Sequence, residues 1–185
     1  TLDPGWTFAG TVIGPDDAPL NGARSFGLTD RGWSHEPMNT AEFKVLAFNP
    51  RRPRDVFFQH VEMGLVGVMQ PPQENGGSVK VQMAPGATIV GRLVEADGTP
   101  QAGVKLDLRY RHKMSSMYFE WSEYFPGDIR TSKDGQFHIE ALLPGYDFRL
   151  SSGKAVVSIR GDTLRSGQTN DLGAVKIDVN GDQHQ

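Results

Sequence analysis

The chain has 185 residues, of which 37% are hydrophobic, and it carries 22 glycines and 12 prolines but no cysteine. Its 19 basic and 22 acidic side chains are interspersed and give a net charge of -3, which argues against nucleic acid or an anionic membrane as a partner. The lack of cysteine excludes a disulfide framework, a thiolate metal site and a cysteine nucleophile. The density of turn-forming residues favours many short strands, so an all-β protein is predicted.

No apolar run approaches the roughly 20 residues of a transmembrane helix, so no membrane insertion is expected. The sequence opens with Thr-Leu-Asp-Pro-Gly and not with Met, and we interpret it as a piece excised from a longer protein. On this interpretation, any targeting signal lies outside the segment.

The first predicted strand, 7–13, belongs to an internal repeat. Residues 1–24 align with 82–105 at a constant offset of 81, and most of the matched positions carry residues that determine backbone conformation. The matched pairs are Pro4-Gly5 with Pro85-Gly86, Gly10 with Gly91, Pro19 with Pro100, and Gly22 with Gly103.

The match resumes further along the chain at larger offsets. Residues 41–45 align with 135–139 at an offset of 94, and 79–81 align with 175–177 at an offset of 96. These offsets indicate that the second copy gained 13 residues before position 135 and about two later. The sequence therefore predicts two domains of one topology, 1–84 and 85–185, with three pairs of equivalent positions: Gly10 and Gly91, Phe43 and Phe137, Val81 and Ile177.

Apolar and polar residues alternate in the predicted strands 105–110, 136–139 and 155–159. This period of two is typical of half-buried antiparallel strands. Six to eight such strands in each copy, separated by Gly, Pro, Asp and Asn, indicate β-sandwiches, and no segment has a sustained helical period.

Four segments of the second copy carry a family resemblance. They are 91–104, Thr-Ser-Lys-Asp-Gly-Gln-Phe-His-Ile at 131–139, Leu-Pro-Gly-Tyr at 143–146 and Asp-Leu-Gly at 171–173. They resemble the carboxypeptidase regulatory-like domains, which have a transthyretin-like (prealbumin-like) seven-stranded Greek-key sandwich. The resemblance covers nearly all of 84–180, and the first copy is similar more loosely, mainly through its alignment with the second.

The resemblance implies a fold of two tandem transthyretin-like Greek-key β-sandwich domains. Members of this family are appendages of carboxypeptidases, membrane receptors or long bacterial surface proteins, and they are not themselves catalytic. We therefore expect no enzyme activity, no catalytic residues and no cofactor, and an extracytoplasmic location, whether periplasmic, cell-surface or secreted. The expected partners are neighbouring domains of a larger bacterial protein.

Several short motifs have two interpretations each. Ser151-Ser-Gly-Lys154 has the Ser-x-x-Lys spacing of some nucleophilic enzymes, but it lies where a hairpin turn is expected. The cluster Arg51-Arg52-Pro53-Arg54 fits either anion binding or a solvated loop. His138 and Glu140 share a strand face, but two ligands are too few for a metal site, and no metal is expected. The first strands contain no lysine for an isopeptide crosslink.

The segment 113–126 is an aromatic insertion in the second copy. Alternation along it predicts that Met117, Phe119 and Trp121 face inward, whereas Tyr118 and Tyr124 are exposed or covered by a partner. Tyrosine and tryptophan supply much of the binding energy at interfaces. The candidate ligand-binding residues are Tyr118, Glu120, Trp121 and Tyr124.

Two functions remain open at this point. The first is a pair of non-catalytic modules that act as spacer and protein-interaction units. The alternative is a carbohydrate- or peptide-binding module that uses the aromatic insertion around Trp121.

Overall fold

The computed structural model of the chain describes residues 5–29, 34, 36–111, 121–124, 128–153 and 155–176. These residues form strands β1 to β15 and one short 3-10 helix, η1 (Gly161–Thr163), and none of them forms a helix that could cross a membrane. The chain divides into two compact units: unit 1 holds the described residues up to Pro85, and unit 2 holds those from Gly86 onward. Four sheets make up the two units as β-sandwiches, so the predicted all-β fold class is confirmed.

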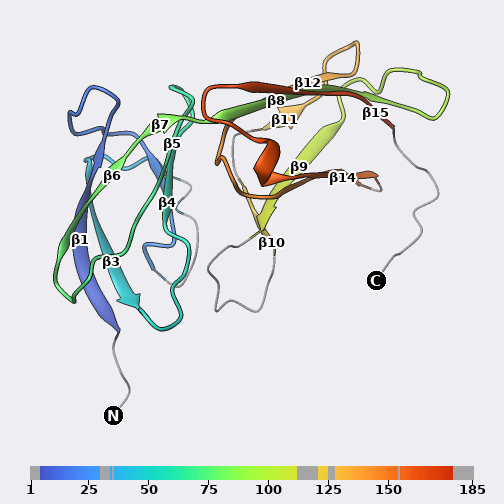
Figure 1. Ribbon diagram of the computed structural model, residues 1–185. Helices are drawn as coiled ribbons and strands as arrows, with labels where there is room; N and C mark the ends of the chain where they lie inside the picture. Colours follow the sequence, from blue (N-terminus) through green and yellow to red (C-terminus); the bar gives the residue numbers. More distant parts are fainter. Residues whose placement is uncertain are drawn as a thin grey trace. The chain divides into compact units, whose positions relative to one another are not determined.

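Unit 1 combines a three-stranded and a four-stranded sheet (Figure 1). The first has the order β3-β1-β6, with β3 antiparallel and β6 parallel to the central strand. The second is antiparallel, in the order β2-β4-β5-β7. The strands are β1 (Trp6–Ile13), β2 (Arg24–Phe26), β3 (Glu42–Phe48), β4 (Phe57–His60), β5 (Leu65–Val68), β6 (Ser78–Gln82) and β7 (Ala84–Pro85).

The core of unit 1 follows from alternation along its strands. In β3, Phe43 and Val45 are buried while Glu42 and Lys44 are exposed. The ring of Phe43 meets that of Phe58 from the other sheet, with centroids 4.6 Å apart. The buried cluster comprises Phe8, Val12, Ala23, Phe43, Val45, Phe48, Val56, Phe58, Leu65, Met69, Val81 and Met83. Because each large apolar side chain contributes about 1.5–3 kcal/mol on burial, this cluster holds the two sheets together.

Unit 2 has the same plan. Its first sheet has the order β12-β8-β15, again with one antiparallel and one parallel neighbour of the central strand. Its second sheet has the order β10-β9-β13-β14, and β11 also pairs with β9. The strands are β8 (Ala87–Val94), β9 (Lys105–Arg111), β10 (Trp121–Glu123), β11 (Ile129–Arg130), β12 (Gln136–Leu142), β13 (Phe148–Ser152), β14 (Ala155–Ile159) and β15 (Thr169–Lys176).

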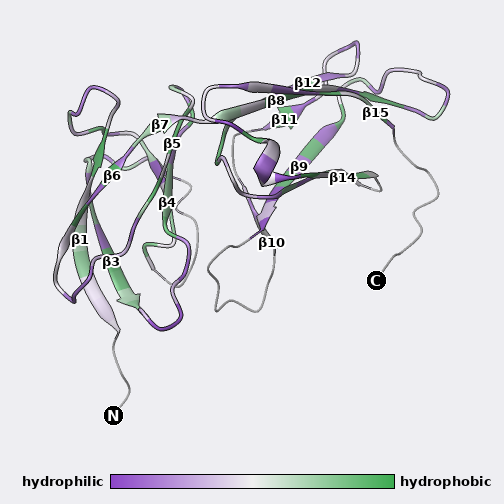
Figure 2. Cartoon of the chain, in the orientation of Figure 1, coloured by the Kyte–Doolittle hydropathy of each residue, from purple (hydrophilic) through white to green (hydrophobic). Residues whose placement is uncertain are grey.

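Strand β9 shows why this second sheet has one apolar face. Leu106, Leu108 and Tyr110 are buried, and the residues between them are exposed. Figure 2 shows both hydrophilic and hydrophobic segments along this strand. The period of two predicted for 105–110 is therefore confirmed.

The internal repeat is confirmed by strand register. Gly10 pairs with Phe43 in unit 1, and Gly91 pairs with Phe137 in unit 2. A β-carbon at either glycine would collide with the ring of the paired phenylalanine. The glycine–phenylalanine pair is thus a packing unit that both sandwiches retain.

The predicted equivalence of Val81 and Ile177 is wrong. Val81 pairs with Val12 in unit 1, whereas Val175 pairs with Leu93 in unit 2, at an offset of 94 and not 96. The offset of 94 equals that between 41–45 and 135–139, so the two additional residues that the alignment assumed later in the second copy are not present; the bulge between Asp171 and Ala174 shifts β15 by one residue only. Val81 and Val175 are both buried, and Ile177 lies outside the described residues.

Each unit also contains a bulge at an alanine with a left-handed backbone. Ala47 has a φ of 51° and Ala141 a φ of 55°, in strands β3 and β12, where the pairing register shifts. Such a conformation costs a non-glycine residue roughly 1–2 kcal/mol. A β-carbon at Gly5 would lie 2.8 Å from the Ala47 carbonyl carbon, and one at Gly86 would lie 2.6 Å from the Ala141 Cα. Both glycines are therefore required by close backbone contact with the bulge.

Candidate functional site

The structure describes only part of the predicted aromatic site. Tyr118 and Glu120 lie outside the described residues. Trp121 begins strand β10 and pairs with Arg111, but its side chain also lies outside what the structure describes. The proposed roles of these three residues stay predictions.

Tyr124 is buried, so the prediction that it is exposed is wrong. Its backbone N–H donates to the Leu108 carbonyl, which continues the pairing of β10 with β9. Paired residues of neighbouring strands share a face, so Tyr124 lies on the core side with Leu108. Its ring packs against that of Phe148 in a T-shaped arrangement, with the ring centroids 5.0 Å apart. Its hydroxyl donates a hydrogen bond to the Ala141 carbonyl at 2.5 Å. Burial raises the pKa of Tyr124 well above its usual value of 10.0.

The basic cluster 51–54 is divided between the surface and the core. Arg51 and Arg52 are exposed, whereas Arg54 is only 8% exposed and lies 5.5 Å over the Phe48 ring. Its guanidinium donates hydrogen bonds of 2.6–3.2 Å to backbone carbonyls, namely those of Gly27, Leu28, Leu46 and Ala47. Neither anion binding nor a solvated loop describes Arg54, because its donors are used inside unit 1.

Arg54 and Tyr124 satisfy equivalent carbonyl groups. Arg54 Nη1 donates to the carbonyl of Ala47 at 2.9 Å, and Tyr124 Oη donates to the carbonyl of Ala141. Both acceptors belong to the left-handed alanine of a bulge, at an offset of 94. The sequence did not reveal these roles, since alanine does not usually mark a left-handed position.

The remaining short motifs have simple outcomes. Ser151 lies in β13, which forms a hairpin with β14, so the hairpin interpretation of 151–154 is confirmed. His138 Nε2 lies 3.3 Å from Glu140 Oε1, and both side chains are more than half exposed. Within the described part of the chain, no three His, Asp or Glu side chains gather in a way that would hold a metal ion.

Unit 2 has a concave surface on the outer side of its β12-β8-β15 sheet. It is a shallow groove of about 750 Å³. Strand β8 contributes Val90 and Arg92, β12 contributes Gln136 and His138, and β15 contributes Asp171. Arg130, Thr131 and Ser132 line it from the segment before β12. The groove therefore combines two guanidinium groups, an imidazole, an amide and a carboxylate.

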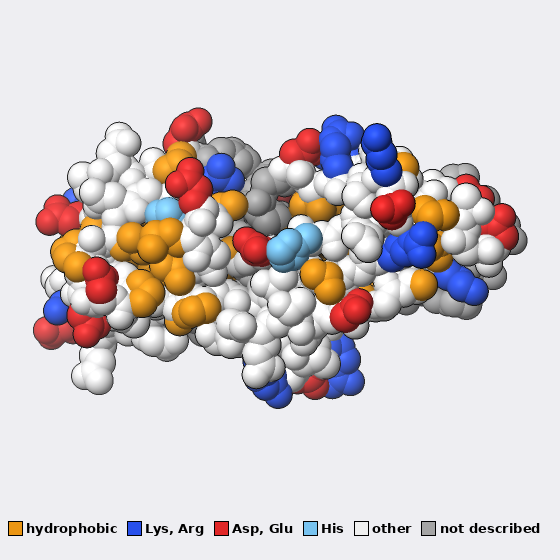
Figure 3. All heavy atoms as spheres, turned by 90° about the horizontal axis from the view of Figure 1, so that it is seen from above, with side chains coloured by type: hydrophobic (Ala, Val, Ile, Leu, Met, Phe, Trp, Pro, Cys, Tyr) orange, Lys and Arg blue, Asp and Glu red, His pale blue; other side chains and the backbone are white. Residues whose placement is uncertain are grey.

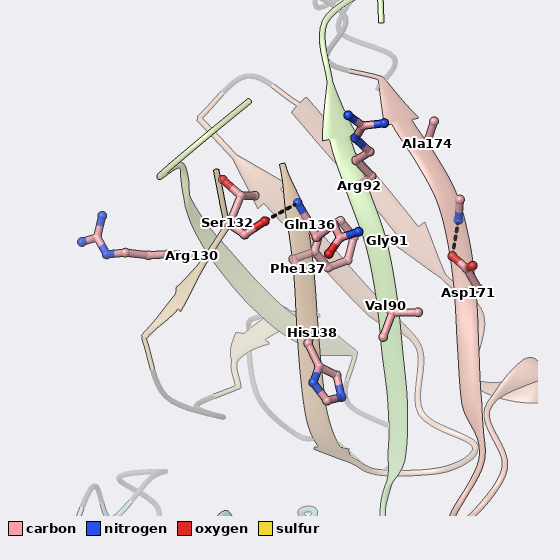
Figure 4. Close-up of a pocket in the computed structure, with 12 residues that line it drawn as sticks. Val90, Gly91, Arg92, Arg130, Ser132, Gln136, Phe137, His138, Asp171 and Ala174 are labelled. Atoms are coloured by element: carbon pink, nitrogen blue, oxygen red, sulfur yellow. Dashed lines mark hydrogen bonds between the residues drawn. The ribbon is translucent and has the colours of Figure 1, made fainter. Parts of the chain in front are cut away.

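Local hydrogen bonds hold the walls of this groove (Figure 4). Ser132 Oγ accepts the backbone N–H of Gln136 at 3.1 Å, and Asp171 Oδ1 accepts that of Gly173 at 2.8 Å. Arg92 Nε donates to the Asp134 carbonyl at 2.8 Å. In Figure 4 the terminal nitrogens of Arg92 lie between β8 and β15, while Arg130 extends away at the opposite side. The two guanidinium groups therefore border the groove on opposite sides.

Unit 1 has a smaller groove at the equivalent place, with a volume of about 560 Å³. Ala9, Thr11 and Lys44 occupy the positions that Val90, Arg92 and His138 occupy in unit 2. Basic and acidic side chains are interspersed over the face shown in Figure 3. The pair of arginines is thus a local feature of the unit 2 groove.

No protein-family model matches the chain, and no curated protein matches it. Among solved structures, a streptococcal ancillary pilin is 14% identical over 95% of this chain and 63% of its own length, with a TM-score of 0.38. The shaft pilin SpaA of Lactobacillus rhamnosus GG is 10% identical over 92% and 97% of the two chains, with a TM-score of 0.32. A C-terminal fragment of the pilus adhesin SpaC from the same organism is 10% identical over 84% and 81%, with a TM-score of 0.29.

The chain is thus distantly similar to tandem β-sandwich domains of pilins and adhesins. It spans less than two thirds of the length of the streptococcal pilin. At these identities and TM-scores the similarity indicates neither a ligand nor an activity.

Replacing Arg54 with Ala should lower the free energy of unfolding of unit 1 by about 3 kcal/mol, because one buried and three partly buried carbonyls lose their charged donor. Urea denaturation monitored by circular dichroism measures this change in the free energy of unfolding. Arg52→Ala is the matched control, and as an exposed site it should change stability by no more than about 0.5 kcal/mol. Equal effects of the two substitutions would show that Arg54 has no structural role.

Replacing Tyr124 with Phe should cost about 1–2 kcal/mol at neutral pH, because the Ala141 carbonyl loses its donor. The raised pKa of Tyr124 in the folded state means that stability present below pH 10.0 is lost as the pH rises above that value. The substitution should therefore also make stability fall less steeply above pH 10. Urea midpoints measured from pH 7 to pH 11 test both effects, and an unchanged pH dependence would contradict the second.

Proposed function

We propose that the chain forms two non-catalytic, carboxypeptidase-regulatory-like modules that serve as spacer and protein-interaction units of a larger, exported bacterial protein. The hydrogen bonds of Arg54 and Tyr124 support this proposal. Arginine and tyrosine often bind ligands, but these two donate to backbone carbonyls of their own units. The repeat supports it as well, since duplicated modules extend a chain without a new active site. An extracytoplasmic location is part of the same proposal.

The observation that carries the spacer proposal is the short connection between the units. Strand β7 pairs with Leu65 and Val66 up to its last residue, Pro85, and β8 begins at Ala87. Gly86, the one residue between them, accepts the Gly167 N–H at 3.0 Å and has no room for a β-carbon. Since every residue of the connection is held by its own sandwich, we expect little freedom of relative orientation.

A second candidate function is recognition of a peptide by the groove of unit 2. Arg92 and Arg130 border the groove from different segments, and guanidinium groups bind carboxylates well. Gln136 and Ser132 add amide and hydroxyl groups that suit a peptide backbone. The favoured ligand of this site is an extended peptide with acidic side chains. The predicted carbohydrate- or peptide-binding role of the aromatic insertion around Trp121 is a separate alternative.

The restricted connection predicts a narrow distribution of distances between the units. Because the chain lacks cysteine, Glu62→Cys and Lys133→Cys introduce two unique spin labels, one on each unit. Double electron–electron resonance should give a narrow distribution for this protein and a broad one after a flexible Gly/Ser segment is inserted between Pro85 and Gly86. Equally broad distributions would overturn the stiff-spacer proposal.

The groove predicts binding of hexaglutamate, observed by NMR titration of the isotope-labelled chain. The perturbed amides should be those of 90–92 and 136–138. Arg92→Ala should raise the Kd about tenfold or more, which corresponds to about 1.4 kcal/mol, whereas Arg160→Ala, outside the groove, should leave it unchanged. Perturbation by a neutral hexasaccharide but not by hexaglutamate would contradict the peptide proposal and favour carbohydrate.

A further inference from the structure

The opening strand of each unit pairs in parallel with a strand near the end of that unit (Figure 1). In unit 1, β1 pairs with β6 from Ala9 and Ser78 to Ile13 and Gln82. In unit 2, β8 pairs with β15 from Thr88 and Thr169 to Val94 and Lys176. The residues between these strands fold into the rest of the sandwich. Both units therefore close their chain through a parallel ladder.

Parallel pairing determines how tension acts on such a ladder. In unit 1, tension along the chain enters at the N-terminal end of β1 and leaves beyond the C-terminal end of β6. These points lie at opposite ends of the ladder because the two strands run in the same direction. The inter-strand hydrogen bonds are then loaded together, in shear. Two paired strands that are pulled apart from the same end of a ladder would instead lose their inter-strand hydrogen bonds one after another.

The inner side of each ladder is also shielded from water. Val12 and Val81 are paired and both are buried, as are Leu93 and Val175. Water competes poorly for hydrogen bonds that lie against such a core. One further backbone bond, from the Met83 N–H to the Ile13 carbonyl at 2.8 Å, extends the unit 1 ladder past its last register pair.

We propose that each unit is a tension-bearing clamp, in which the β1–β6 ladder and the β8–β15 ladder resist force along the chain. This inference rests on the proposed spacer function, since a spacer transmits tension between its neighbours. The ladder of unit 1 is unbroken, whereas the bulge between Asp171 and Ala174 divides that of unit 2. Unit 1 therefore carries the longer continuous block of bonds under shear.

Single-molecule force spectroscopy tests the clamp by changing only the point of attachment. One handle is fixed at the N-terminus, and the other is attached to Cys in either Ser78→Cys or Gln82→Cys. Both sites are exposed, both belong to β6, and the chain has no other cysteine. Attachment at Gln82 loads the β1–β6 ladder in shear, and attachment at Ser78 opens the same ladder from one end.

The unfolding force at Gln82 should exceed that at Ser78 several-fold, because forced unfolding depends on the barrier that the ladder presents. Pulling between the chain ends should give two unfolding events of about 280 and about 320 Å of contour for units 1 and 2, at about 3.6 Å per residue. Circular dichroism confirms that both variants are folded. Equal forces in the two geometries would overturn the clamp, while the spacer function would still be decided by the inter-unit distance distribution.

Discussion

In each sandwich, the carbonyl of a bulged alanine accepts a hydrogen bond from a buried side chain, and much of the surrounding structure depends on this contact. The bulges at Ala47 and Ala141 place these residues in the left-handed region, and their carbonyls accept hydrogen bonds from buried side chains. Leaving such an acceptor without a donor costs about 1–3 kcal/mol. The glycine that packs on each bulge, Gly5 or Gly86, must also stay without a side chain. The bulge in each sandwich thus requires two things: a glycine before the first strand, and a buried side chain that donates a hydrogen bond.

This constraint also separates structural from functional chemistry. Arginine and tyrosine are among the side chains most used in recognition. In this protein Arg54 and Tyr124 contact backbone carbonyls, and both are buried. The groove proposed for peptide recognition lies instead on the outer side of a sheet, where Arg92 and Arg130 border it. On that proposal, recognition and folding use different faces of the unit 2 sandwich.

The sequence predicted the fold well because the repeat is carried by residues with strict backbone or packing roles. Gly10 and Phe43 align with Gly91 and Phe137, and the register pairs them in the same way. The sequence was less informative about the ends of the repeat. Val-Lys-Val at 79–81 resembles Val-Lys-Ile at 175–177, and a slip of two residues preserves the alternation of apolar and polar positions, so Val81 was matched with Ile177 although Val175 takes its place.

The candidate site was harder to predict for a different reason. Alternation along 113–126 leaves open which face is turned inward, and the register of β10 (Trp121–Glu123) with β9 decides which face Tyr124 occupies. The burial of Arg54 was not predicted, because three arginines within four residues usually indicate an exposed loop. Its acceptors include the carbonyls of Gly27 and Leu28, which are distant in the sequence. The groove of unit 2 involves residues from four strands and a loop, and no local motif joins them.

The two donors come from different parts of their modules. Arg54 lies in the connection between β3 and β4, whereas Tyr124 follows β10, a strand without a counterpart among the described residues of unit 1. Exchanging loops between the two units would therefore have different consequences for each unit. A version of unit 2 shortened to the loop lengths of unit 1 would lose the donor for its bulge, unless an arginine were supplied at the position equivalent to Arg54. Tyr124, which lies within the insertion of unit 2, supplies an interior hydrogen bond, so deleting the insertion would remove a donor that the fold uses.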